Sequence, residues 1–99
     1  MVKKALWVRL EAKPGKEEAL AQFLIDGLGL AREEQATIAW FGLRLGPSSF
    51  GIFDAFADED GRDAHLNGNI AAALHARTPE LLAKPPSIEK IDVLAGKLP

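Results

Sequence analysis

The most constraining feature of this 99-residue sequence is a pair of adjacent segments, 36–45 and 49–57, that are apolar on both faces. Each segment has the two-residue period of a β-strand, and the Gly-Pro-Ser sequence between them is typical of a turn, so together they predict a β-hairpin. Phe41 and Trp40, for example, point to opposite sides. A large apolar sheet face is unusual on the surface of a monomer, so both sides of this hairpin must be covered.

The segments on either side of the hairpin complete a β-α-β-β-α-β order. Residues 4–12 and 88–95 alternate as strands do. A helical stripe of apolar residues begins at Lys16, and Gly27 and Gly29 predict its end. Two βαβ halves in this order predict a ferredoxin-like α+β fold, with a four-stranded antiparallel sheet and helices on one face.

The helical region after the hairpin contains two predicted interruptions. Asp58 precedes two acidic residues and is a suitable N-cap. Asn67-Gly68-Asn69 predicts a break, because glycine costs a helix interior ~1 kcal/mol and asparagine favours turns. Further along, Thr78-Pro79 predicts a new helix start with proline in the first helical position.

Composition excludes several classes of protein. The length accommodates one domain, residues 1–99. Twelve basic and 14 acidic side chains give a net charge of −2, so we expect no nucleic-acid partner. There is no cysteine and there are two histidines ten positions apart, which leaves no metal site to predict within one chain. No apolar run approaches the ~18 residues of a membrane span, and no secretion signal is recognisable, so we expect no membrane partner and a cytoplasmic location.

The second strand of the hairpin and the residues after it carry a family resemblance. The stretch 50–59 (FGIFDAFADE), followed by His65-Leu66, resembles the antibiotic-biosynthesis monooxygenase family, which has an aromatic, an acid, a second aromatic and then His-Leu one to two turns later. Residues 12–18 resemble its usual first turn, and Glu34 and Trp40 fit its second strand. The sequence has Ile70 where the family often has a second histidine.

This resemblance implies a dimeric α+β barrel, in which the sheets of two identical subunits face each other. It also implies a pocket between the sheet and the helices of each subunit. Some relatives oxidise hydroquinones or polycyclic phenols with molecular oxygen and no cofactor, whereas others degrade haem. We therefore expect a homodimer, a small aromatic ligand, and neither a cofactor nor a metal.

His65 and Asp54 are the candidate catalytic residues. A histidine with a pKa near 6.5 can accept a proton from a phenol at neutral pH. Alternatively, His65 is structural and only hydrogen-bonds Asp54 or nearby backbone. Asp54 either orients His65 or pairs with Arg44 across the hairpin, and the sequence leaves both alternatives open.

The candidate substrate-binding residues are Trp40, Phe53, Phe56 and Asn67. The aromatic residues could line a pocket for a flat ligand, although aromatic residues on strands are more often part of the core. Asn67 could donate a hydrogen bond to a substrate oxygen, but its place in a turn explains it equally well.

Together with these residues, the resemblance implies a cofactor-independent monooxygenase that acts on a quinol, an anthrone or another electron-rich aromatic. In this hypothesis His65 accepts a proton and the aromatic side chains keep water out of the pocket. The alternative is a dimer of the same fold that binds a small molecule without catalysis, or a relative that binds or degrades haem.

Overall fold

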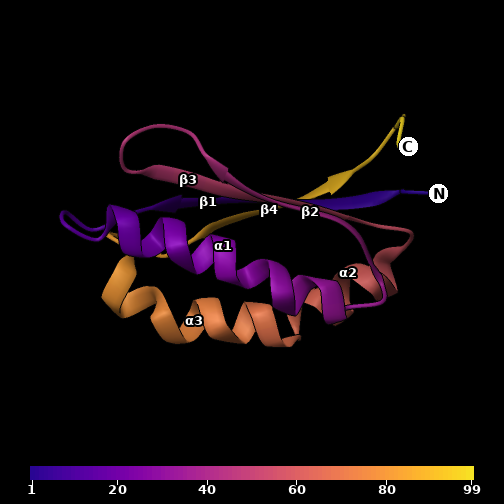
Figure 1. Cartoon of the computed structure of the whole chain (residues 1–99). Coiled ribbons are helices and arrows are strands. Elements are labelled where there is room, and N and C mark those ends of the chain that lie inside the picture. The colour runs from indigo at the N-terminus through magenta and orange to yellow at the C-terminus, as the bar shows by residue number, and fades with distance from the viewer.

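The computed structural model describes all residues from 1 to 99 and arranges them as seven elements (Figure 1). The strands are β1 (Lys4–Glu11), β2 (Thr37–Arg44), β3 (Ser49–Phe56) and β4 (Ser87–Asp92). The helices are α1 (Glu17–Glu33), α2 (Glu59–Leu66) and α3 (Asn69–Leu81). This is the predicted βαββαβ order, with the second helical region divided into α2 and α3.

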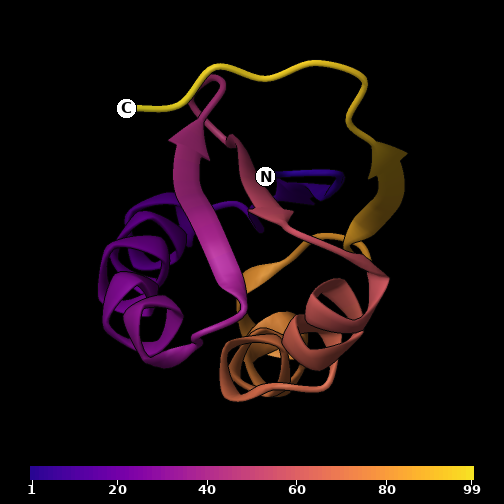
Figure 2. The same ribbon diagram turned by 90° about the vertical axis from the view of Figure 1, so that its right-hand side faces the viewer.

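The four strands form one antiparallel sheet in the order β2-β3-β1-β4. All three helices lie against the same face of this sheet, which gives a two-layer structure (Figures 1 and 2). The predicted ferredoxin-like α+β fold is confirmed. None of the helices combines the length and the apolar character that a membrane-spanning helix needs.

The strand register assigns each strand residue to one of the two faces of the sheet. Asp54 of β3 lies between Leu6 of β1 and Trp40 of β2, and this row faces the helices. Phe41 and Phe53 are paired on the opposite face, as the two-residue period predicted. Between the sheet and the helices lies a buried cluster of nine side chains, namely Val8, Leu10, Ala12, Leu20, Leu24, Phe50, Ile52, Leu81 and Leu82.

The face away from the helices is open and apolar. Phe41 is 51% exposed there. β4 ends at Asp92, earlier than the predicted end at residue 95, because Asp92 pairs with Lys4, the first residue of β1, and no strand lies beyond it. The remaining residues, 93–99, cross over the open face without regular structure (Figure 2). A space of about 900 Å³ lies between this tail and the sheet.

Helix α1 extends to Glu33, so the predicted helix end at Gly27 and Gly29 is wrong. Gly27 is buried where α1 crosses the sheet, and a Cβ there would lie only 3.1 Å from Ile70 Cδ1 and 3.5 Å from the Trp40 ring. At this position the absence of a side chain allows close packing, which outweighs the low helix propensity of glycine.

The predicted break between residues 67 and 69 is confirmed, since α2 ends at Leu66 and Gly68 is the N-cap of α3. The predicted helix start at Thr78-Pro79 is wrong, because α3 continues through Pro79 to Leu81. Pro79 lies in the last turn and lacks the N–H that would bond the carbonyl of His75, so α3 loses one backbone hydrogen bond there. Thr78 Oγ1 also donates a hydrogen bond of 2.8 Å to the Leu74 carbonyl.

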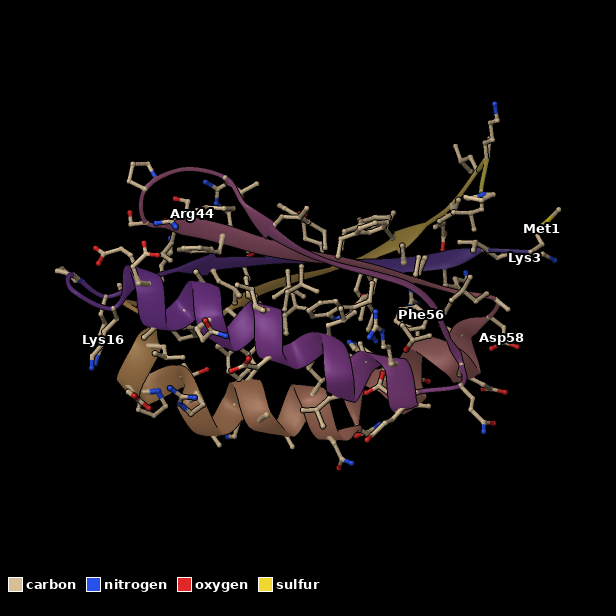
Figure 3. All side chains as sticks on the ribbon, in the orientation of Figure 1. Met1, Lys3, Lys16, Arg44, Phe56 and Asp58 are labelled. Atoms are coloured by element: carbon tan, nitrogen blue, oxygen red, sulfur yellow. The ribbon has the colours of Figure 1, made fainter.

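Asp58 fixes the start of α2, the helix that carries His65. Its side chain accepts a hydrogen bond of 2.8 Å from the Gly61 N–H, as expected of the predicted N-cap. Figure 3 shows Asp58 at the end of the molecule where β3 passes into α2, close to Phe56. The cap therefore determines where this helix begins relative to the sheet.

We predict that Asp58→Ala lowers the free energy of unfolding by about 1 kcal/mol, because one amide at the start of α2 loses its acceptor. Asp58→Asn keeps an acceptor oxygen and should retain most of the stability. Asp63→Ala, at an exposed position within the same helix, is the matched control. Urea unfolding of the three variants measures the effect, and equal stability of the Asp58→Ala and control variants would contradict it.

Candidate active site

Three titratable side chains from three elements meet beneath the sheet. Glu34 follows the last turn of α1, Asp54 lies on β3 and His65 lies in the last turn of α2. His65 Nδ1 lies 2.6 Å from Glu34 Oε1, and His65 Nε2 lies 2.9 Å from Asp54 Oδ2. Asp54 is completely buried, and the His65 side chain is 8% exposed. Of the two partners that the sequence left open for Asp54, this geometry agrees with His65.

Neighbouring side chains hold this cluster of Glu34, His65 and Asp54 in place. Thr37 Oγ1 donates a hydrogen bond of 2.9 Å to Glu34 Oε1. The ring of Phe56 packs against the imidazole, with 5.3 Å between the ring centroids. The other partner considered for Asp54, the Arg44 guanidinium, instead forms an ion pair of 2.9 Å with Glu18 at the molecular surface.

The two carboxylates determine the protonation state of His65. Burial by itself would lower the pKa of this imidazole, but the contacts with Asp54 and Glu34 outweigh burial and raise the pKa above its usual 6.5. An imidazolium between two carboxylates gives the cluster a net charge of −1. In this form both ring nitrogens already carry a proton, so His65 cannot accept another.

A small cavity adjoins the cluster, between the sheet and helices α2 and α3. Its volume is about 210 Å³, and nine of the 14 residues that line it are hydrophobic. Asp54, His65 and Trp40 are among the residues that line it. The Asp54 carboxylate is completely buried and ion-paired with His65, and Trp40 Nε1 is buried without an acceptor. The Glu34, His65 and Asp54 cluster therefore lies directly behind a largely apolar cavity wall.

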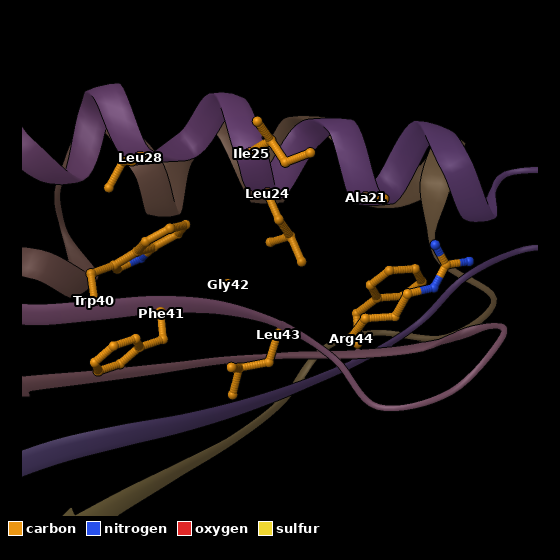
Figure 4. A pocket seen from close by; sticks show the side chains of 10 residues that line it. Ala21, Leu24, Ile25, Leu28, Trp40, Phe41, Gly42, Leu43 and Arg44 are labelled. Atoms are coloured by element: carbon orange, nitrogen blue, oxygen red, sulfur yellow. The ribbon is translucent and has the colours of Figure 1, made fainter.

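A wider groove of about 500 Å³ lies between α1 and β2 (Figure 4). Eight of its ten lining residues are hydrophobic, and its only charged side chain is Arg44, which is paired with Glu18. Trp40 lines both this groove and the smaller cavity. Since the groove contains no group that could accept a proton, the smaller cavity is the candidate active site.

The structure separates the predicted substrate-binding residues. Trp40 lines the cavity, and Phe56 packs behind His65 without lining it. Phe53 lies on the open face of the sheet, because neighbouring residues of a strand point to opposite sides. The Asn67 side chain donates to the carbonyl of Asp63, 2.9 Å away, at the end of α2. Phe53 and Asn67 therefore do not reach the cavity.

Sequence reasoning missed the role of Glu34, which it noted only as part of the family resemblance. Glu34 is 31 positions from His65, and no local pattern connects the two residues. His75, the second histidine of the chain, is exposed on α3 and also contributes to the cavity wall. No group of three histidine, aspartate, glutamate or cysteine side chains is arranged to hold a metal ion.

Two solved structures share this architecture at low sequence identity. A putative antibiotic biosynthesis monooxygenase from Nitrosomonas europaea superposes with a TM-score of 0.82 and 16% identity, over 93% of this chain and 99% of that chain. A putative antibiotic biosynthesis monooxygenase from Caulobacter crescentus CB15 superposes with a TM-score of 0.80 and 16% identity, over 95% of this chain and 92% of that chain. The chain thus has the antibiotic-biosynthesis-monooxygenase-like fold, and at the level of fold the resemblance seen in the sequence is confirmed.

A third structure defines the family more narrowly. The Nitrosomonas europaea protein NE2512, described as a protein of unknown function, is 65% identical over 100% of this chain and 96% of its own, with a TM-score of 0.98. The chain belongs to the family of this protein. No protein-family model and no curated protein matches the sequence.

The raised pKa of His65 predicts how stability depends on pH. The imidazolium is favoured in the folded state, so its contribution is fully present below pH 6.5 and is lost as the pH rises through the folded pKa. We expect the free energy of unfolding to fall over that range, and His65→Gln to remove this part of the fall. NMR titration of His65 and denaturation between about pH 5 and pH 9 measure both quantities. A His65 pKa below 6.5 would contradict the prediction.

Proposed function

We propose that the protein is a cofactor-independent monooxygenase that oxidises a small, electron-rich aromatic, such as a single-ring hydroquinone, with molecular oxygen. The observation that carries this proposal is the Asp54 carboxylate, which is completely buried, adjoins an apolar cavity and is held by His65 at 2.9 Å. The monooxygenase names of the two structural neighbours described above support it further.

In the proposed reaction Asp54 accepts the proton of the substrate hydroxyl. The cluster of Glu34, His65 and Asp54 carries a charge of −1 when His65 is protonated, and one further proton makes it neutral. Neutralisation of the cluster offsets the new negative charge on the substrate within the same apolar space. His65 keeps the Asp54 carboxylate in position. The sequence suggested the reverse, with His65 as the proton acceptor and Asp54 as the residue that orients it.

The deprotonated substrate supplies the electrons. For 1,4-dihydroxybenzene, one oxygen atom of O₂ enters the ring and the other leaves as water, and the ring is oxidised to hydroxy-1,4-benzoquinone. The substrate carbon skeleton is oxidised by four electrons, which reduce both atoms of O₂, and the two hydrogens that the substrate loses leave in the water. The chain itself contributes the proton acceptor, the fixed position of the substrate and a site that excludes water.

The size of the cavity selects among the expected substrates. An apolar cavity of about 150 Å³ holds one benzene molecule, so about 210 Å³ accommodates one substituted ring. A three-ring anthrone would extend beyond this space. Haem is larger still, and both nitrogens of His65 are engaged by carboxylates, which leaves neither for an axial bond.

The test is oxygen consumption with a panel of one-, two- and three-ring hydroquinones and phenols. We predict uptake with one-ring substrates, and a fall of about 10²- to 10⁴-fold in the rate for Asp54→Asn, which keeps the shape but removes the charge. Asp63→Asn, an exposed carboxylate of α2, is the matched control and should retain the wild-type rate. Circular dichroism of each variant verifies folding.

Two results would contradict the proposal. One is full activity of folded Asp54→Asn protein, which would remove the proton acceptor from the mechanism. The other is ligand binding without any oxygen uptake, which would identify the protein as a non-catalytic small-molecule-binding module. The hydrophobic majority of the cavity lining is the feature that favours this second candidate.

We also propose that the open face of the sheet packs against a second copy of the chain. The face carries Phe41, which is 51% exposed, together with Phe53, and the tail above it carries Leu94, which is 98% exposed. Apolar surface of this extent is commonly covered by a two-fold related copy. Each copy would then present its cavity on the side away from the interface.

We predict a sedimenting mass of about twice the 10.7 kDa chain mass at micromolar concentration. Phe41→Asp should weaken the dimer strongly, because a carboxylate would be buried without a partner. Ile25→Asp is the matched control, since Ile25 is an exposed apolar residue of α1, away from the open face. A monomeric wild-type protein would contradict the proposal, as would an unchanged dimer of Phe41→Asp.

A further inference from the structure

We propose that the mouth of the cavity is a carboxylate-binding site, in which His75 and Lys90 hold the acidic group of a ligand whose apolar part fills the cavity. The ligand class is a small monocarboxylate with an apolar part about the size of one ring. This inference rests on the cavity being the ligand site of the proposed function. It does not require that the ligand be oxidised or that it touch Asp54.

The mouth of the cavity is the place where exposed residues enter its lining. Two buried residues, His65 and Ile70, line the inner part. His75 of α3 and Ile88 of β4 also line the cavity, and both are exposed. Ile88 is 51% exposed because no helix packs closely against β4, which Figure 2 shows at the edge of the sheet farthest from α1. The cavity therefore opens to solvent between α3 and β4.

Two basic side chains flank this mouth. His75 lines it directly, and its imidazole carries at least one N–H that can donate a hydrogen bond. Lys90 follows Ile88 by two positions, so its side chain leaves β4 on the same face, opposite Leu6, which also lines the cavity. Neither His75 nor Lys90 takes part in an ion pair. Both donors are therefore free to bind an anionic group.

The acidic side chains of β4 and α3 do not compete for these donors. Asp92, the next residue on this face of β4, lies 2.7 Å from Lys4 Nζ. Glu89 points to the opposite face of the sheet, since neighbouring strand residues alternate. On α3, Glu80 lies 2.8 Å from Arg77 Nε. An anionic ligand at the mouth thus meets no free carboxylate from either element.

The inner part of the cavity determines which way the ligand lies. With His65 protonated, the cluster of Glu34, His65 and Asp54 has a net charge of −1 behind the cavity wall. A carboxylate pushed inward would be repelled by this charge and would lose its hydration in an apolar space. An apolar cavity of about 150 Å³ holds one benzene molecule, so about 210 Å³ holds a ring with one further carbon. The acidic group therefore stays at the mouth.

The donors at the mouth suit a carboxylate better than a phosphate. Phosphate sites typically use several backbone N–H groups at a helix N-terminus or in a glycine-rich loop. His75 lies in the middle of α3, away from its N-terminus at Asn69, and residues 82–86 between α3 and β4 contain no glycine. One or two charged donors are enough to bind a carboxylate.

The experiment compares phenylacetate with phenylacetamide, which has nearly the same shape but no charge, by calorimetry at low ionic strength. We expect wild-type protein to prefer the acid by about 3- to 10-fold, and added salt to reduce the preference. His75→Gln and Lys90→Gln should each reduce it, and the double variant should bind both ligands equally. Lys97→Gln, at an exposed lysine of the tail outside the cavity, is the matched control and should keep the preference.

A second measurement uses only the wild-type fold. The imidazole resonances of His75, distinguished from those of His65 by the His75→Gln variant, should shift more with phenylacetate than with phenylacetamide. Equal shifts with both ligands, binding of neither ligand, or an unchanged preference in the double variant would overturn the inference.

The failure of this inference is distinguishable from the failure of the proposed function, because phenylacetate has no hydroxyl group to be oxidised. If the preference depends on His75 and Lys90 but no hydroquinone leads to oxygen uptake, the inference stands and the proposed activity fails. If oxygen is consumed with hydroquinones but the acid is not preferred, the proposed activity stands and the inference fails.

Discussion

Asp54 of β3 places a carboxylate entirely in the interior, and the positions of two other elements, α1 and α2, are tied to the groups that compensate this charge. A buried charge is destabilising by several kcal/mol unless an opposite charge accompanies it. His65 supplies that charge and Glu34 holds the other side of the imidazole, so α1, β3 and α2 must meet at one point. A Cβ at Gly68 would lie 2.9 Å from Glu34 Oε2, so the break between α2 and α3 also provides room for this cluster.

Sequence periodicity was sufficient to predict the four strands of the sheet, because the residues of each strand alternate and each turn has recognisable residues. The two apolar sides of the hairpin became the core face with Trp40 and the open face with Phe41. Helix ends were predicted less well. Gly27 and Pro79 are poor helix residues, yet both lie within helices. Close packing at Gly27 and the Thr78 side-chain bond outweigh propensity there, and neither contact can be recognised before the fold is known.

The candidate site was predictable only in part, because it also depends on contacts that cannot be recognised before the fold is known. Asp54 and His65 share a family-like pattern of spacing, which indicated that they belong together but not which atoms meet. Glu34 could not be placed, because its position depends on α1 continuing beyond Gly29 to Glu33. Strand alternation could have separated Phe53 from Asp54, since adjacent residues point to opposite faces. The identity of the face that the helices cover required the tertiary structure.

The charge of the cluster bears on the choice between catalysis and simple binding. A module that only holds an apolar ring needs no buried charge near its wall, because each buried charge lowers stability and an apolar residue would fill the same volume. With His65 protonated between two carboxylates, the cluster would be one proton short of neutrality, beside a cavity of about 210 Å³. A ligand that gives up a proton would neutralise the cluster, and a ligand without an acidic hydrogen would not. This difference is what the proposed proton transfer to Asp54 depends on.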